Sequence, residues 1–166
     1  MILAATTDTG YKIVLVLHHL SVIIGAGAMF ALPVVVVLMR KARDQSRADI
    51  LAMVGATMKA VVAPALLLAG VFGGALVGFS DDLYDFSQTW LAIAGPLWIV
   101  LVALVWFVVA PAQLAVARLT RELATGDRDA IEGRIAAISS RIGMASGVTH
   151  LGLIVMLYLM AFRPGL

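Results

Sequence analysis

Four long stretches of the chain are almost free of charged residues, and their length limits the fold more than any other feature. A helix of about 20 residues crosses the roughly 30 Å of hydrocarbon in a bilayer. Strand-type alternation is absent, and each stretch is far longer than a membrane strand of about 10 residues. The sequence therefore predicts transmembrane helices at about 11–39, 53–80, 86–117 and 142–162, in a single domain that covers 1–166.

The composition agrees with a membrane protein, because 62% of the residues are hydrophobic and only 13% are charged. Soluble domains average about 45–50% apolar and about 25% charged residues. So little polar surface excludes a soluble enzyme. The chain has no cysteine, which excludes disulfides, thiolate metal sites, covalently attached haem and a cysteine nucleophile.

Charged residues between the stretches predict how the chain is oriented. The first and third connections are rich in arginine and lysine, whereas the second has three aspartates and no basic residue. Basic loops stay in the cytoplasm, so we expect both termini outside it and no nucleic acid partner. These residues are Arg40, Lys41, Arg43 and Arg47 in the first connection, Asp81, Asp82 and Asp85 in the second, and Arg118, Arg121, Arg128 and Arg134 in the third.

The connections are short, so successive helices are expected to be antiparallel neighbours. This predicts an all-α, up-down bundle of four transmembrane helices, with residues 118–141 forming a helical extension into the cytoplasm. Small residues four apart allow close packing of membrane helices. Such stripes occur at Gly70, Gly74 and Gly78, and at Gly143 and Gly147.

The informative ionisable residues within the stretches are His18, His19, Lys59 and His150. Ionisable groups are costly at membrane depth, so each is a candidate functional residue. Structural alternatives exist for all of them. His18 or His19 can be an interfacial histidine, and Lys59 can extend its ammonium group to the inner surface.

His150 has two interpretations as well. One is an ordinary hydrogen bond to Ser146, Thr149 or a neighbouring helix. The other is a b-type haem whose iron is held by His18 and His150, since bundle cores often house such groups. The two histidines reach equal depth if Tyr11 and Tyr158 mark the outer surface. If Lys12 and Arg163 mark it instead, their depths differ by about 10 Å.

Each predicted helix also carries a short motif. The motifs are His18 followed by Phe30, Leu32 and Pro33; Lys59 five residues before Pro64-Ala65; Trp90-Leu91; and Phe162-Arg163-Pro164. Together they resemble the small bacterial haem-binding protoporphyrinogen IX oxidases. Similar patterns occur in the copper-resistance D-type membrane family and in an uncharacterised family of predicted integral membrane proteins. The resemblance implies a protein of the bacterial inner membrane, with His18 as haem ligand.

One position departs from the oxidase pattern. The oxidases have a lysine four residues after the tryptophan of the Trp-Leu motif, and Ala94 occupies that position here. An alanine cannot orient a substrate or transfer a proton. We therefore carry over the haem ligand and not the oxidase activity, which makes the uncharacterised family the closer match.

Two functions remain from this sequence. The first is a protein that binds haem b for electron transfer or porphyrin handling, with His18 as ligand and His150 or His19 as the second. The alternative is an accessory or assembly subunit that contacts the lipid bilayer and a larger membrane complex, or a second copy of itself. A transporter or a copper protein is a weaker interpretation, because the methionines are scattered over different depths.

Overall fold

The computed structural model describes residues 8–39, 44–80 and 83–165, and within them all regular structure is helical. The helices are α2 (Thr9–Leu38), α3 (Asp44–Thr57), η2 (Met58–Val62), α4 (Ala63–Gly78), α5 (Thr89–Ala103), η3 (Leu104–Val109), α6 (Ala110–Glu122) and α7 (Arg128–Phe162). The predicted all-α fold is confirmed. Several residues that predicted the orientation, namely Arg40, Lys41, Arg43, Asp81 and Asp82, lie outside the described residues.

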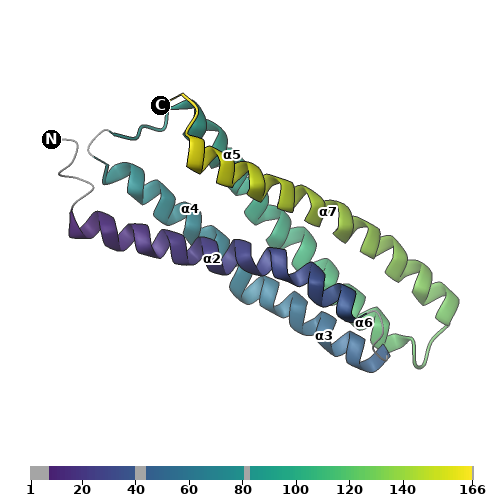
Figure 1. Cartoon of the computed structure of the whole chain (residues 1–166). Helices are drawn as coiled ribbons and strands as arrows, with labels where there is room; N and C mark the ends of the chain where they lie inside the picture. Colours follow the sequence, from purple (N-terminus) through teal and green to yellow (C-terminus); the bar gives the residue numbers. More distant parts are fainter. Residues whose placement is uncertain (1–7, 40–43, 81–82, 166) are drawn as a thin grey trace.

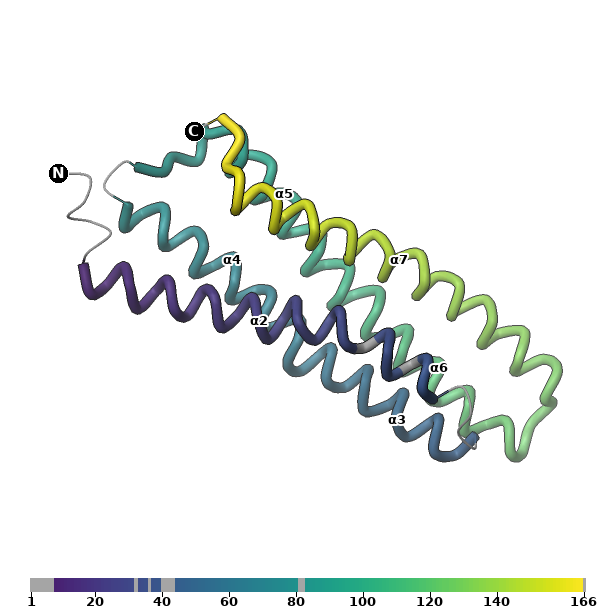
Figure 2. The backbone as a smooth tube through the Cα atoms, viewed as in Figure 1, coloured from purple at the N-terminus to yellow at the C-terminus, as the bar shows by residue number. Residues whose placement is uncertain are grey.

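These helices form four long rods that run side by side in alternating directions (Figure 1). The rods are α2, then α3 with η2 and α4, then α5 with η3 and α6, and finally α7. Figure 2 shows all four extending along one long axis. Each rod contains a segment long and apolar enough to cross a membrane, namely Thr9–Val35, Asp44–Gly78, Thr89–Glu122 and Arg128–Phe162.

The two ends of the bundle differ in chemistry. We call the end with the first turn of α3 and the α6–α7 connection the basic end, and the end with the first turn of α2 and the last turn of α7 the terminal end (Figure 1). At the terminal end α2 packs on α4 and α5 packs on α7, whereas near the basic end α3 packs on α6. Residues 118–141 comprise the last turn of α6, the connection and the first part of α7.

Side chains fix where the long helices begin. The carboxylate of Asp8 accepts a hydrogen bond from the backbone N–H of Gly10, and that of Asp127 accepts one from Ala130, each at 3.3 Å. Both contacts satisfy backbone donors that a first turn leaves unpaired. At the other end of α7, Arg163 adopts a left-handed conformation with φ 44°, and its N–H bonds to the carbonyl of Leu159.

Two turns of π-helix interrupt the second and third rods, and each ends two residues before a proline. The sequence Val-Val-Ala-Pro-Ala occurs twice, at 61–65 and at 108–112. Pro64 and Pro111 cannot donate a backbone hydrogen bond, and their rings would clash with a carbonyl of the preceding turn. The wider turns η2 and η3, closed by the N–H of Ala63 on Met58 and that of Ala110 on Val105, accommodate both rings.

These two π-helical turns lie against each other in the main hydrophobic core. Their fully buried residues join buried side chains from α2 and α3 in one cluster. Two π-helical turns, each leading into the same Val-Val-Ala-Pro-Ala segment, therefore lie in the main core. The residues of the two turns in this cluster are Met58, Val62, Val105 and Val109, and the first residues of α4 and α6, Ala63 and Ala110, belong to it as well.

Glycines allow close helix contacts, but the predicted stripes are not the main ones. Close contacts occur at Gly25 with Leu66, at Gly55 with Leu114, at Gly70 with Trp98 and at Gly152 with Leu101. In contrast, a Cβ atom at Gly74, Gly78, Gly143 or Gly147 would meet no described atom within 4 Å. Of the two stripes, only Gly70 packs within the chain, because Trp98 covers it and donates a hydrogen bond of 2.7 Å to the carbonyl of Leu66.

Large apolar side chains cover the outside of the bundle. Exposed fractions reach 66% for Ile23, 75% for Phe107 and 68% for Leu157. Such a surface would associate in water but is satisfied by lipid chains. We therefore describe the chain as an integral membrane protein with four transmembrane helices.

Candidate functional site

His18 is the candidate residue that the bundle buries most completely. It lies on the face of α2 that packs on α4 and is 8% exposed. Its Nδ1 atom is 2.8 Å from the carbonyl oxygen of Ala69. Since a carbonyl can only accept, Nδ1 carries the proton and Nε2 keeps its lone pair. Within the described residues, Nε2 has no hydrogen-bond partner.

A glycine on α4 makes room for this imidazole. A Cβ atom at Gly73 would lie 3.3 Å from Cε1 and 3.4 Å from Nδ1 of His18. Few real Cβ atoms come so close to a ring, so a larger residue at 73 would push the ring away from Ala69. Gly73 lies outside the glycine stripe that drew attention in the sequence, and only the structure connects it with His18.

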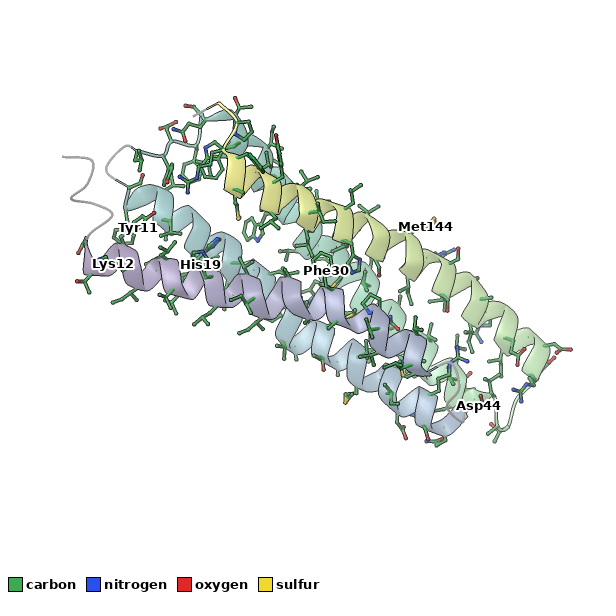
Figure 3. The ribbon with its side chains drawn as sticks, viewed as in Figure 1. Tyr11, Lys12, His19, Phe30, Asp44 and Met144 are labelled. Carbon is green, nitrogen blue, oxygen red and sulfur yellow. The ribbon has the colours of Figure 1, made fainter. Side chains whose placement is uncertain are left out.

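His19 does not share the contacts of His18 with α4. It is exposed, and its Nδ1 donates to the carbonyl of Leu15 in the preceding turn of α2. Its ring meets that of His18 edge to face at 5.7 Å. Figure 3 labels His19 together with Tyr11 and Lys12, which mark the same end of α2.

His150 joins α7 to α2 far from His18. Its Nε2 is 2.9 Å from the carbonyl oxygen of Met29, and its Nδ1 faces that of Ser146. The ring also meets Phe30, which is labelled in Figure 3, edge to face at 5.1 Å. Both nitrogens face carbonyl oxygens, so neither presents a free lone pair to a metal. The expectation of an interhelical hydrogen bond at His150 is confirmed.

The two predicted haem ligands are therefore not brought together. Met29 is eleven residues beyond His18 on α2, which corresponds to about 16 Å of helix. The prediction of equal depth is wrong, and so is the paired arrangement of His18 and His150 that depended on it.

The error comes from the choice of Tyr158 as the outer marker. Arg163 instead lies at the terminal end, where its guanidinium donates to the hydroxyl of Tyr84 and covers the Tyr84 ring at 5.0 Å. Tyr158 lies a turn further inward and stacks on Phe162. The alternative boundary, set by Lys12 and Arg163, gives the correct direction, since it places His150 deeper than His18. Its difference of about 10 Å is smaller than the roughly 16 Å along α2.

Lys59 and Ala94 lie in different surroundings. Lys59 is exposed on η2, facing away from the core, and makes no hydrogen bond or ion pair with any described residue. Ala94 is buried against Trp90 and Leu159 near the terminal end. In the described part of the chain, no group of three or more His, Cys, Asp or Glu residues is placed to hold a metal ion.

Comparison with known proteins gives one match. A family described as predicted integral membrane protein (DUF2269) matches residues 12–164, nearly the whole chain. No curated protein and no solved structure matches the chain. The match agrees with the resemblance to an uncharacterised family of predicted integral membrane proteins. No match supports the resemblance to the oxidases or to the copper-resistance family.

Proposed function

Because the chain belongs to the DUF2269 family of predicted integral membrane proteins, we propose a membrane function for its one buried histidine: His18 binds b-type haem as an axial ligand. The observation that carries the proposal is the contact of 2.8 Å between Nδ1 of His18 and the carbonyl of Ala69. A histidine that ligates a metal usually donates its other ring proton to such a group. The ring is thereby held in one tautomer with Nε2 available.

The surroundings of His18 are apolar. Gly73 lies against its imidazole without a side chain of its own, whereas Trp98 covers Gly70 one turn away on α4. Haem bound there would supply one-electron redox chemistry at its iron. The chain contributes a ligand of fixed orientation and a hydrocarbon environment that excludes water. His150 is not part of this site. It contacts Met29, which lies about 16 Å from His18 along α2.

The proposal is tested by haem content and absorption spectra. Wild-type protein, purified in detergent after expression with added haem precursor, is expected to show a Soret band and sharp bands after reduction by dithionite. His18→Ala is expected to lose most of the haem measured as pyridine haemochrome. His19→Ala and His150→Ala are matched controls and should retain it. Wild-type protein without haem, or equal haem content in His18→Ala, would disprove the proposal.

A second candidate, the accessory subunit, has its own supporting observation. Gly74 and Gly78 on α4 and Gly147 on α7 meet no described neighbour within 4 Å. Small residues of this kind let another membrane helix approach closely. If a partner helix docks there, Gly78→Leu or Gly147→Leu should abolish a complex seen for the wild type by cross-linking in membranes. The same substitution at Gly27, which also has open space on α2, is the control.

A further inference from the structure

A groove lies between α2, α3, α6 and α7 in the half of the bundle nearer the basic end. It has a volume of about 420 Å³, and its walls include Met29, Met39, Leu51 and Ile142. Met29 and Met39 are ten residues apart, so the groove follows α2 for about 15 Å. This is about half of the hydrocarbon thickness of a bilayer, which is the depth of one leaflet.

Gln113 on α6 gives this apolar groove a polar side. The residue is only 7% exposed and lines the groove, yet its amide makes no hydrogen bond with the residues that the structure describes. A primary amide carries two donors and an acceptor, and leaving them unpaired in an apolar site is costly. Every fully enclosed polar side-chain atom in the described chain has a partner. The amide of Gln113 is therefore accessible from the groove.

A positive charge lies at the mouth of the groove. Arg47 on α3 is half-buried and lines the groove near the basic end. The nearest acidic residues on α3 are already engaged, since Asp44 pairs with Arg128 and Asp49 pairs with Arg121. Arg47 forms no ion pair with a described residue, so its guanidinium is available to an anion.

The two polar groups lie at different depths. Leu114 contacts Gly55, which places Gln113 near the level of Gly55, eight residues beyond Arg47 on α3. This separation corresponds to about 12 Å along the helix, and the long stem of the arginine shortens it. A ligand of the groove therefore meets a cation first, an amide next and an apolar channel last.

We propose that this groove binds one anionic glycerophospholipid from the leaflet at the basic end. The phosphate accepts hydrogen bonds from Arg47, an ester carbonyl accepts one from the amide of Gln113, and one acyl chain lies against Met29 and Ile142. A free phosphate would use only the mouth of the groove. A phospholipid uses the charge of Arg47, the amide of Gln113 and the length of the groove together. The site is independent of His18.

The test uses native mass spectrometry of the full chain in detergent, titrated with phosphatidylglycerol or with phosphatidylcholine of the same acyl chains. Wild-type protein should bind phosphatidylglycerol about tenfold more tightly, because both lipids offer Arg47 a phosphate but the ammonium group of choline offsets the negative charge. Arg47→Gln should remove this preference, and Arg47→Lys should keep most of it. Gln113→Leu should weaken both lipids, since both have esters. Arg134→Gln, an exposed change on α7, is the control.

Three results of these titrations would overturn the proposal. They are equal binding of both lipids to the wild type, an unchanged preference in Arg47→Gln, and an equal loss in Arg134→Gln. Glycerol 3-phosphate should fail to displace phosphatidylglycerol at equal concentration, because it has no acyl chain. Full displacement would show that the mouth binds a free anion and that no lipid site exists. His18→Ala should bind lipid like the wild type, whatever its haem content.

Discussion

The Nε2 atom of His150 lies 2.9 Å from the carbonyl oxygen of Met29, and this contact joins the last helix of the bundle to the first. Otherwise α7 packs mainly on α5 and α6, and α2 packs mainly on α4. Only a short stretch of α2 approaches α7, where Phe30 also meets the imidazole. His150 therefore closes a bundle that would otherwise be open between its first and fourth rods.

Loss of this contact should destabilise the protein. We expect His150→Ala to lower the free energy of unfolding by about 0.6–2 kcal/mol, the range for interhelical hydrogen bonds in membranes. The measurement is the thermal midpoint in detergent, followed by circular dichroism. His19→Ala removes an imidazole whose only hydrogen bond to a described residue is within its own helix, and it should leave the midpoint nearly unchanged. Equal midpoints for the two variants would contradict the bridging role.

Gly70 should not tolerate a side chain. A Cβ atom there would collide with the Trp98 ring, and that ring is held by its hydrogen bond to the carbonyl of Leu66. Gly70→Ala should therefore cost about 1–3 kcal/mol of stability, as overpacked sites do. Gly27→Ala, which meets open space on α2, should be neutral or stabilising by up to about 1 kcal/mol. Denaturant unfolding of both variants checks this, and a stable Gly70→Ala protein would contradict the packing.

The orientation in the membrane is open to a direct test. Arg47, Arg118, Arg128 and Arg134 all lie toward the basic end, so we expect this end in the cytoplasm. Ser46 and Ser87 are exposed at the basic and terminal ends, and the chain has no cysteine of its own. A membrane-impermeant thiol reagent added to intact cells should label Ser87→Cys and not Ser46→Cys. The reverse pattern would invert the orientation.

Much of the fold could be predicted from the sequence. Long apolar stretches, short connections and separated charges were enough for four antiparallel helices, because a bilayer allows few alternatives. The π-helical turns were missed, although the repeated Val-Val-Ala-Pro-Ala segment was a visible signal. Its meaning depends on how the π-helical turns η2 and η3 pack against each other in the core, and hydropathy does not contain that information.

The candidate site was harder to predict. The burial of His18 depends on Gly73 and on the carbonyl of Ala69. Every residue has a backbone carbonyl, so the sequence does not show which one accepts the hydrogen bond. The pairing of His18 with His150 failed because Tyr158 was taken as the outer marker of α7. Counting from a residue a few positions too far inward places His150 several ångströms too near the outer surface. Gln113 was overlooked because only ionisable residues were considered within the predicted helices, and an amide carries no charge.

The final prediction concerns porphyrinogen oxidation, which we expect to be absent or very weak. Ala94 occupies the position where the resembling oxidases have lysine, and it is buried against Trp90 and Leu159. No proton can be transferred there by a methyl group. Because a lysine at this buried position would need a partner, Ala94→Lys should destabilise the protein rather than create activity. Expression in a strain without its own protoporphyrinogen oxidase provides the measurement, with an active oxidase as the positive control. Growth restored by the wild-type chain would contradict the prediction and would require another residue to take the role of the missing lysine.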